Sequence, residues 1–179
     1  MEGPMIVDPR DQLWNAVYDT YYECYWREFV SDKVVNRWEI VDLITKVLVA
    51  MTASGSAVAG WQFWNQPGFQ ELWAVLAGFA ALVAIVHAAL SIPRRLADWG
   101  EVKRIFAGLR VDLETLRHRM EIDSEFSVEE FTQQYVEYRQ RYKDGIQLIK
   151  NDILFTRRVR VKSMADVDRH LAANRNRKL

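Results

Sequence analysis

Residues 47–70 are VLVAMTASGSAVAGWQFWNQPGFQ, and residues 72–93 are LWAVLAGFAALVAIVHAALSIP. Neither run contains Asp, Glu, Lys or Arg, and Glu71 alone separates the two. Each run is longer than the roughly 18–20 apolar residues that an α-helix needs to cross a hydrocarbon core about 30 Å thick. Pro67 and Gly68 supply a turn signal between the runs. The stretch therefore predicts a two-helix transmembrane hairpin with spans at about residues 43–64 and 72–92.

The remaining sequence is strongly charged. The chain has 179 residues, 27% of them charged, and a formal net charge of zero. A hairpin buried in a soluble core is the alternative to a membrane hairpin, but two adjacent uncharged runs of this length are unusual in so short a chain. Residues 1–20 lack the basic start and apolar stretch of a signal peptide, so we expect the first span to act as its own insertion signal. Cys24 is the only cysteine, which excludes an intrachain disulfide.

The positions of the basic residues predict the orientation of the hairpin. Lys46 directly precedes the first uncharged run, and Arg94 and Arg95 directly follow the second. Because Lys and Arg accumulate on the cytoplasmic side of a membrane, we expect both termini in the cytoplasm. Indole rings favour the headgroup level, and tryptophans gather near the expected outer turn. The expected membrane-boundary residues are therefore Trp61, Trp64, Trp73, Arg94 and Arg95.

The predicted fold class is an all-α integral membrane protein with four segments. We expect an amphipathic cytoplasmic helix at 1–39, the transmembrane hairpin at 40–95, a cytoplasmic helical hairpin at 96–155, and a basic tail with a short helix at 156–179. Aromatic residues in the first segment recur every three or four positions, at Trp14, Tyr18, Tyr21, Tyr25 and Phe29. We expect this stripe to pack on other helices. The alternative is contact with the inner leaflet, against which the acidic excess of the segment argues.

The third segment has the pattern of two helices. The first carries an apolar face with heptad-like spacing, made of Trp99, Val102, Phe106, Leu109, Leu113, Leu116 and Met120. After a break at Ile122–Phe126, Ser127 and Glu130 form a capping-box pattern. The second helix is expected to continue to about Leu154, with one face made of Val128, Phe131, Tyr135, Tyr138, Tyr142, Ile146, Ile149 and Ile153. Their short connection predicts an antiparallel pair.

The tail is basic. Arg157, Arg158, Arg160 and Lys162 alternate in part with valines, which predicts a short extended segment, followed by a helix from Ser163 to about residue 173. Three partners fit this charge: anionic lipid, a neighbouring subunit, or a nucleotide or nucleic acid. Nucleic acid ranks last because no nucleic-acid-binding module is recognisable.

The sequence shows no constellation typical of catalysis. His87, His118 and His170 are far apart and lack zinc-ligand spacing, and no phosphate-binding glycine loop occurs. Cys24 lies on the tyrosine-rich face and is interpreted as a small packing residue. We therefore predict no catalytic residue, no metal, no cofactor and no enzymatic activity.

The spans contain two faces of interest. The first span has a polar or small face that is a candidate pore lining, made of Asp42, Thr45, Thr52, Ser56 and Gly60. The alternative for Asp42 is a simple pair with Lys46 at the inner boundary. The second span has a small-residue face expected to pack against a helix, made of Ala77, Ala81, Ala84 and Ala88. His87 lies beside that face and is either a pH sensor or a hydrogen-bonded packing residue. Two spans cannot enclose an aqueous path, so a pore requires several copies in a closed ring.

This layout resembles the SLATT family, the bacterial two-transmembrane effector domains associated with SMODS and SLOG sensor systems. The resemblance covers an amphipathic helix at Leu13–Phe29, a hairpin of Leu43–Trp64 and Leu72–Ile92, an inner Pro93-Arg94-Arg95, and a helical region after it. It rests on architecture without a diagnostic motif, and it transfers no catalytic residue.

The resemblance implies a homo-oligomeric, pore- or channel-forming effector of antiviral defence in the inner (plasma) membrane of a bacterium. Its expected partners are membrane lipid, further copies of the chain and a separate sensor protein. The alternative function is a non-conducting membrane scaffold that recruits a cytoplasmic partner through its helical region.

Overall fold

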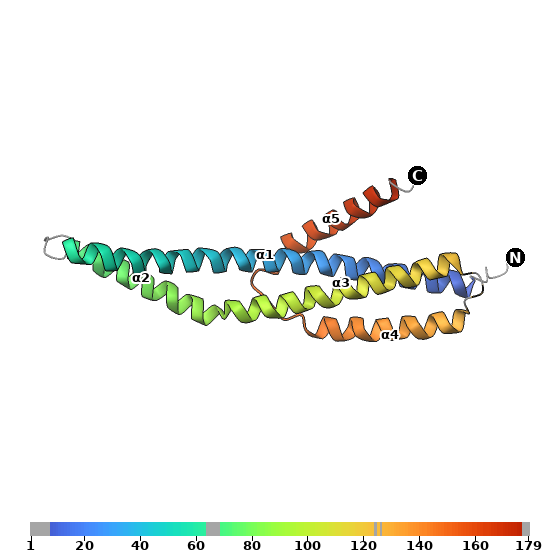
Figure 1. Cartoon of the computed structure of the whole chain (residues 1–179). Helices are drawn as coiled ribbons and strands as arrows, with labels where there is room; N and C mark the ends of the chain where they lie inside the picture. The colour runs from blue at the N-terminus through green and yellow to red at the C-terminus, as the bar shows by residue number, and fades with distance from the viewer. Residues whose placement is uncertain (1–7, 64–68, 124, 126, 177–179) are drawn as a thin grey trace. The chain divides into compact units, whose positions relative to one another are not determined.

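The computed structural model describes residues 8–63, 69–123, 125 and 127–176, with side chains except at 52–63, 69–73, 76 and 174–176. The described residues form the helices α1 (Pro9–Phe63), α2 (Phe69–Leu90), α3 (Ile92–Ile122), α4 (Val128–Gln147) and α5 (Arg157–Asn176), shown in Figure 1. No strand occurs among them, which confirms the all-α class. Contacts divide the chain into a helical unit, residues 1–34 and 98–179, and an apolar unit, residues 35–97.

Helix α1 runs without interruption from the N-terminal segment into the first uncharged run. Pro9 occupies its first position, where a missing N–H costs nothing, and Asp8 Oδ1 accepts from the Arg10 N–H at 2.9 Å. No Gly or Pro occurs between Pro9 and Gly55, so no residue in that interval breaks the helix. The amphipathic segment expected at 1–39 and the start of the first predicted span therefore belong to one helix.

Helices α2 and α3 are separated by a single residue, Ser91, which has a left-handed backbone with φ of 48°. Pro93 explains the break, because proline lacks an N–H and clashes with the preceding helical turn. The Arg95 Nε donates to the Leu90 carbonyl at 2.9 Å and satisfies one acceptor at the end of α2. Pro93 and Arg95 therefore both help to fix where α2 ends.

One helical stretch of the described residues, Ala77–Ile122, contains a window long and apolar enough to cross a membrane, and 6% of that window is buried. A core helix of a soluble protein would be mostly buried, so this exposure favours association with a membrane. Most side chains of the first predicted span, 43–64, lie outside those described.

The core of the helical unit confirms the heptad face of α3. Every predicted residue of that face is buried, namely Trp99, Val102, Phe106, Leu109, Leu113, Leu116 and Met120. The Phe106 ring meets the Tyr142 ring of α4 edge-on, with centroids 5.8 Å apart. On α1, the Glu28 carboxylate accepts from the Arg110 Nε of α3 at 2.6 Å, and the Ala16 carbonyl accepts from the Tyr135 hydroxyl of α4 at 3.0 Å. These contacts join α1, α3 and α4 in one bundle.

The aromatic stripe of α1 packs on α3, as expected, but it is only partly buried. The innermost line of α1 is instead made of Val17, Thr20, Tyr21, Cys24, Val30, Ser31 and Val34. Arginines of α3 cover the rings: the Arg117 guanidinium lies 5.3 Å from the Tyr21 ring centroid, and the Arg110 guanidinium lies 4.9 Å from that of Tyr25. Tyrosine suits such a half-buried position, because its ring face is electron-rich and attracts the guanidinium and its hydroxyl can reach water.

Helix α4 begins as predicted and ends early. The Ser127 Oγ accepts from the Glu130 N–H at 3.1 Å, which confirms the N-cap. The helix stops at Gln147, so the expected continuation to Leu154 is wrong. The cause is tertiary: the Trp99 indole N–H donates to Asp152 at 3.0 Å and draws the following segment onto α3. Ile153, expected on the buried face, is 64% exposed.

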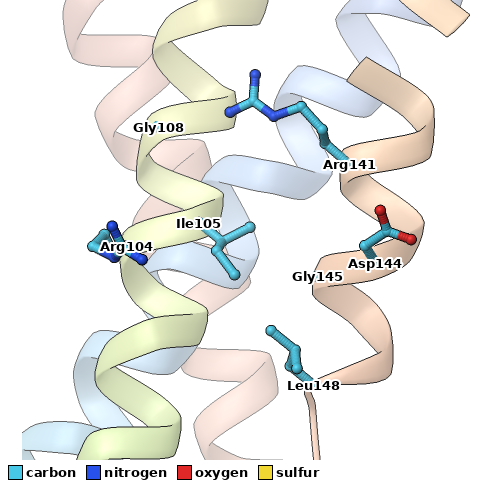
Figure 2. A pocket seen from close by; sticks show the side chains of 7 residues that line it. All are labelled: Arg104, Ile105, Gly108, Arg141, Asp144, Gly145 and Leu148. Carbon is cyan, nitrogen blue, oxygen red and sulfur yellow. The ribbon is translucent and has the colours of Figure 1, made fainter. Parts of the chain in front are cut away.

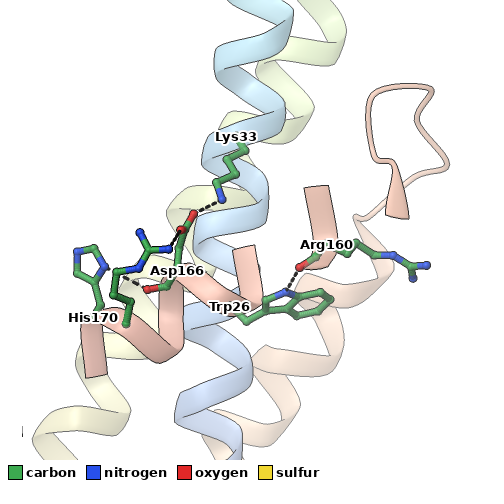
Figure 3. Close-up of polar contacts among 6 residues, drawn as sticks. Trp26, Lys33, Arg160, Asp166 and His170 are labelled. Carbon is green, nitrogen blue, oxygen red and sulfur yellow. Dashed lines mark hydrogen bonds and ion pairs between the residues drawn. The ribbon is translucent and has the colours of Figure 1, made fainter. Parts of the chain in front are cut away.

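The C-terminal segment is helical from Arg157, so the extended segment predicted at 157–162 is wrong. Val159, Ser163 and Val167 are buried, a spacing of four that suits a helix. In Figure 3 the Trp26 indole N–H of α1 donates to the Arg160 carbonyl, at 3.2 Å, while Lys33 pairs with Asp166. Helix α5 therefore packs on α1.

Two glycines provide a test of the α3–α4 packing. A Cβ added at Gly145 would lie 3.1 Å from Ile105 Cγ2 and from Phe106 Cζ, whereas a Cβ at Gly108 would meet nothing within 4 Å. Alanine favours helix over glycine by roughly 1 kcal/mol. We expect Gly108→Ala to raise the free energy of unfolding by about 0.5–1 kcal/mol, and Gly145→Ala to lower it by about 1–3 kcal/mol through overpacking. Denaturant unfolding of the detergent-solubilised chain, followed by circular dichroism, measures both. Equal stabilisation by the two variants would contradict this packing.

The Lys33–Asp166 pair predicts a pH dependence. The hydrogen bond from Lys33 holds the pKa of the Asp166 carboxyl below its usual range. Because this pKa is lower in the folded than in the unfolded chain, the stabilisation is complete above the usual carboxyl range, near pH 4, and is lost as the pH falls through the lower folded-state value. We expect Asp166→Asn to lower the thermal midpoint at neutral pH and to have little effect in strong acid. Glu137→Gln, at an exposed site of α4, serves as the control, and a pH-independent loss in Asp166→Asn would refute the pair.

Candidate functional site

The apolar unit contains one cluster of ionisable side chains that bridges its two helices. Asp42 of α1 lies opposite His87 of α2, with 3.4 Å between Oδ1 and Nε2. The second carboxylate oxygen of Asp42 pairs with the Lys46 ammonium at 2.5 Å, one turn along α1. The Asp42 side chain is 15% exposed, against 30% for His87 and 67% for Lys46. Asp42 is therefore the centre of the cluster, and each of its oxygens has a different partner.

A pair of Asp42 with Lys46 was the alternative to a pore-lining role for Asp42, and the structure shows that pair. The sequence did not predict that His87 faces Asp42, because the two residues are 45 positions apart. One signal was available: in an antiparallel hairpin, the start of the first helix lies beside the end of the second. Asp42 and His87 are the ionisable groups at those two places.

Of the other candidate pore-lining residues, only Thr45 has a described side chain. Its hydroxyl lies 2.9 Å from the carbonyls of both Val41 and Asp42 in its own helix. This back-bonding gives the hydroxyl a partner within α1, as is common for Thr inside helices. Thr52, Ser56 and Gly60 lie in α1, but their side-chain positions are outside the described set, so their role stays a prediction.

A second group of contacts lies beside the cluster, where α2 ends and α3 begins. Trp38 is 1% exposed, and the Arg95 guanidinium lies 5.2 Å from its ring centroid. Ile92 is also buried, whereas Arg94 is exposed. A tryptophan stacked under an arginine suits a boundary between apolar and aqueous surroundings. The outer tryptophans Trp61, Trp64 and Trp73 lie outside the described side chains.

The alanine face of α2 is exposed among the described residues. Its four members are exposed, namely Ala77, Ala81, Ala84 and Ala88. The less exposed side of α2, at Ala80, Val83, His87 and Leu90, is turned by roughly 100° around the helix axis. The expected packing of the alanine face therefore has no intrachain partner among the described residues, and it stays a prediction for contacts between copies.

Large apolar side chains of the apolar unit are exposed on both helices. They are Ile40, Leu43, Ile44, Val47, Val49 and Met51 on α1, and Val75, Phe79, Leu82, Ile85 and Val86 on α2. Contiguous apolar surface of this extent is rare on a soluble monomer and marks contact with lipid or with protein.

The helical unit offers a groove between α3 and α4, of about 500 Å³, shown in Figure 2. Its lining residues are Arg104, Ile105, Gly108, Arg141, Asp144, Gly145 and Leu148. Its charged members also take part in surface pairs, such as Arg141 with Asp112 at 2.6 Å. The lining lacks Ser, Cys and His, so no nucleophile–base pair is present in this groove.

Cys24 lies elsewhere in the helical unit and is 0% exposed. Its burial raises the pKa of the thiol to about 12, which keeps it protonated at neutral pH. This agrees with a packing role. Within the described residues, no group of three His, Cys, Asp or Glu is placed to hold a metal ion.

The unequal burial within the Asp42 cluster predicts unequal effects of substitution. Asp42→Asn removes the charge that attracts both His87 and Lys46, whereas Lys46→Gln removes one exposed partner. We expect Asp42→Asn to lower the thermal midpoint of the chain in lipid nanodiscs clearly more than Lys46→Gln does. Equal midpoints for the two variants would show that the contact between α1 and α2 does not depend on Asp42.

The side chains of Asp42, His87 and Lys46 can hold or transfer a proton where α1 meets α2. The large side chains exposed around them are apolar. Comparison of the chain with protein-family models, with curated proteins and with solved structures finds no match.

Proposed function

We propose that this chain is one subunit of a homo-oligomeric membrane protein, in which both apolar runs cross the membrane and several copies enclose a conducting path. The helical unit would lie in the cytoplasm and receive the signal that opens it. The proposal is supported chiefly by one observation: the large apolar side chains of the apolar unit are exposed on both of its helices.

Lipid is the occupant that best accounts for that exposure. The exposed residues belong to two helices that contact each other through polar groups at Asp42 and His87. A soluble helix pair shows the opposite arrangement, with apolar groups between the helices and polar groups outside. In hydrocarbon surroundings the arrangement is reversed. Apolar side chains then face the lipid, and ionisable groups face protein or water.

The need for several copies follows from the small size of the unit. Two helices leave no room for an aqueous path between them, so the path must be formed by a ring. The exposed alanine face of α2, with Ala77, Ala81, Ala84 and Ala88, lets a helix of a second copy approach closely. Asp42 would lie at the inner end of such a path, where its charge attracts cations.

The resemblance to the SLATT family gives this proposal its biological setting. On this proposal the protein would lie in the inner membrane of a bacterium, with both termini in the cytoplasm, and would act as an effector of antiviral defence triggered by a separate sensor. Arg94 and Arg95, directly after the apolar run, support that orientation.

A non-conducting scaffold is the second candidate. The observation in its favour is the outer surface of the helical unit, where Val136 of α4 is 60% exposed and a groove separates α3 from α4. A soluble partner could bind there without any flux through the membrane. Under this function, deletion of residues 96–179 abolishes recruitment and leaves the membrane anchor intact.

Ion flux from liposomes decides between the two functions. We expect the purified chain, reconstituted with a trapped ion-sensitive dye, to release ions, and Asp42→Asn to reduce cation flux several-fold by removing the charge at the inner end. Glu137→Gln is the matched control, since it removes one negative charge from an exposed site of α4, outside the apolar unit. A monomer in nanodiscs that never conducts, with or without cell extract from infected bacteria, would refute the pore and leave the scaffold.

A further inference from the structure

Helix α5 has two chemically different sides, and its acidic residues are engaged by its own chain. Asp168 accepts a hydrogen bond from the Tyr22 hydroxyl of α1 at 2.6 Å, and Asp166 pairs with Lys33 of α1, as Figure 3 shows for the latter. The apolar residues Val159 and Val167 are buried on the same side as Ser163. The contacts with α1 therefore involve the acidic and the buried apolar groups of α5.

A second side of α5, turned by about 120° around the helix from the buried residues, is basic and exposed. With a helical turn of about 100° per residue, Arg158, Lys162 and Arg169 fall within about 40° of one another. All three are exposed. Of the three, only Arg169 forms an ion pair with a described residue, at 3.6 Å from Asp166 and with 78% of its side chain exposed. This strip of positive charge is thus largely free to meet an outside partner.

An apolar strip runs beside the basic one. Val161 is 62% exposed, and Ala165 and Ala172 follow it on the same face of the helix. Met164, on the flank of this face, is 50% exposed. A shallow apolar strip bordered by Lys and Arg is typical of helices that lie in the headgroup region of a membrane. A groove of nucleic acid would leave the exposed Val161 and Met164 without a suitable contact.

The first turn of α5 adds a further reason for an anionic partner. It contains Arg157, Arg158 and Arg160 and no acidic residue. Positive charge at a helix N-terminus opposes the helix dipole, at a typical cost of 0.3–1 kcal/mol per charge. A negatively charged surface against this turn offsets that cost.

We propose that the exposed face of α5, defined by Arg158, Val161, Lys162, Ala165 and Arg169, binds the surface of an anionic lipid bilayer. The proposal rests on the membrane placement given above but not on conduction. The cations attract the negatively charged headgroups, and Val161 enters the apolar boundary beneath them. The interaction gives the protein a second lipid contact, separate from its apolar unit and dependent on lipid charge.

A dye on the apolar strip tests this. An environment-sensitive fluorophore is attached to Val161→Cys in the full chain, held in nanodiscs of zwitterionic lipid or of zwitterionic and anionic lipid mixed. The buried thiol of Cys24 does not compete for the label. We expect a blue shift, and quenching by a quencher carried on lipid, only in the anionic discs. High salt should reverse both, because it screens the surface potential.

Charge removal gives the matched comparison. Each Lys or Arg near an anionic surface contributes about fivefold to binding, so Arg158→Gln, Lys162→Gln and Arg169→Gln together should weaken docking on the order of a hundredfold and abolish the blue shift. The control is an equal charge change on α3, α4 and the segment after it, with Arg104→Gln, Lys143→Gln and Lys150→Gln, which should leave the shift intact. Ala165→Cys replaces Val161→Cys as the label site if the latter variant does not fold.

The outcomes separate the proposals. An identical signal in both kinds of disc, or a signal that survives the Arg158, Lys162 and Arg169 substitutions, overturns lipid docking. A shift produced by added single-stranded nucleic acid but not by anionic lipid overturns it also. Co-elution of the chain with the discs shows in the same samples that membrane insertion has succeeded, so a failure of docking is distinguished from a failure of the proposed membrane function.

Discussion

The absence of charged side chains from residues 47–70 and 72–93 is the constraint on which the rest of the structure depends. In the helical unit, large apolar residues such as Phe106 and Leu109 are buried between helices, as the hydrophobic effect requires in water. In the apolar unit, Leu82 and Ile85 are exposed, and the contact between the helices includes Asp42 and His87. The same chain thus obeys two opposite rules of burial, which is the expected result when its parts face different solvents.

Periodic features could be predicted from the sequence, and features set by distant contacts could not. The α3 face from Trp99 to Met120 repeats every three or four residues, so its burial followed from spacing alone. The early end of α4 depends on Trp99 holding Asp152, a contact without any local signal. The start of α5 was missed because Val159 and Val161 suggest a strand, but only Val159 is buried and the spacing to Ser163 is helical.

The helical unit contains a part-buried polar network between α1 and α4 that the sequence did not indicate. The Tyr142 hydroxyl of α4 hydrogen-bonds Glu23 of α1 and accepts from the Arg27 Nε at 3.1 Å. Nearby, the Thr20 hydroxyl meets that of Tyr135 at 2.9 Å. Apolar packing alone leaves helices free to slip by a turn, whereas hydrogen bonds between specific side chains are satisfied in one register. The network therefore fixes α4 against α1.

The continuity of α1 gives that register a wider consequence. Tyr142 and Tyr135 hold α1 at Glu23 and Thr20, and the same helix continues to Asp42 without a Gly or Pro. A helix without Gly or Pro lacks the residues at which sharp kinks usually occur. Under the proposed function, a partner that changes the register of α4 on α1 would turn Asp42 relative to His87. The hydrogen bonds at Thr20 and Glu23 and the ion pair at Asp42 thus lie on one continuous helix, which under the proposed function links the helical unit to the apolar unit.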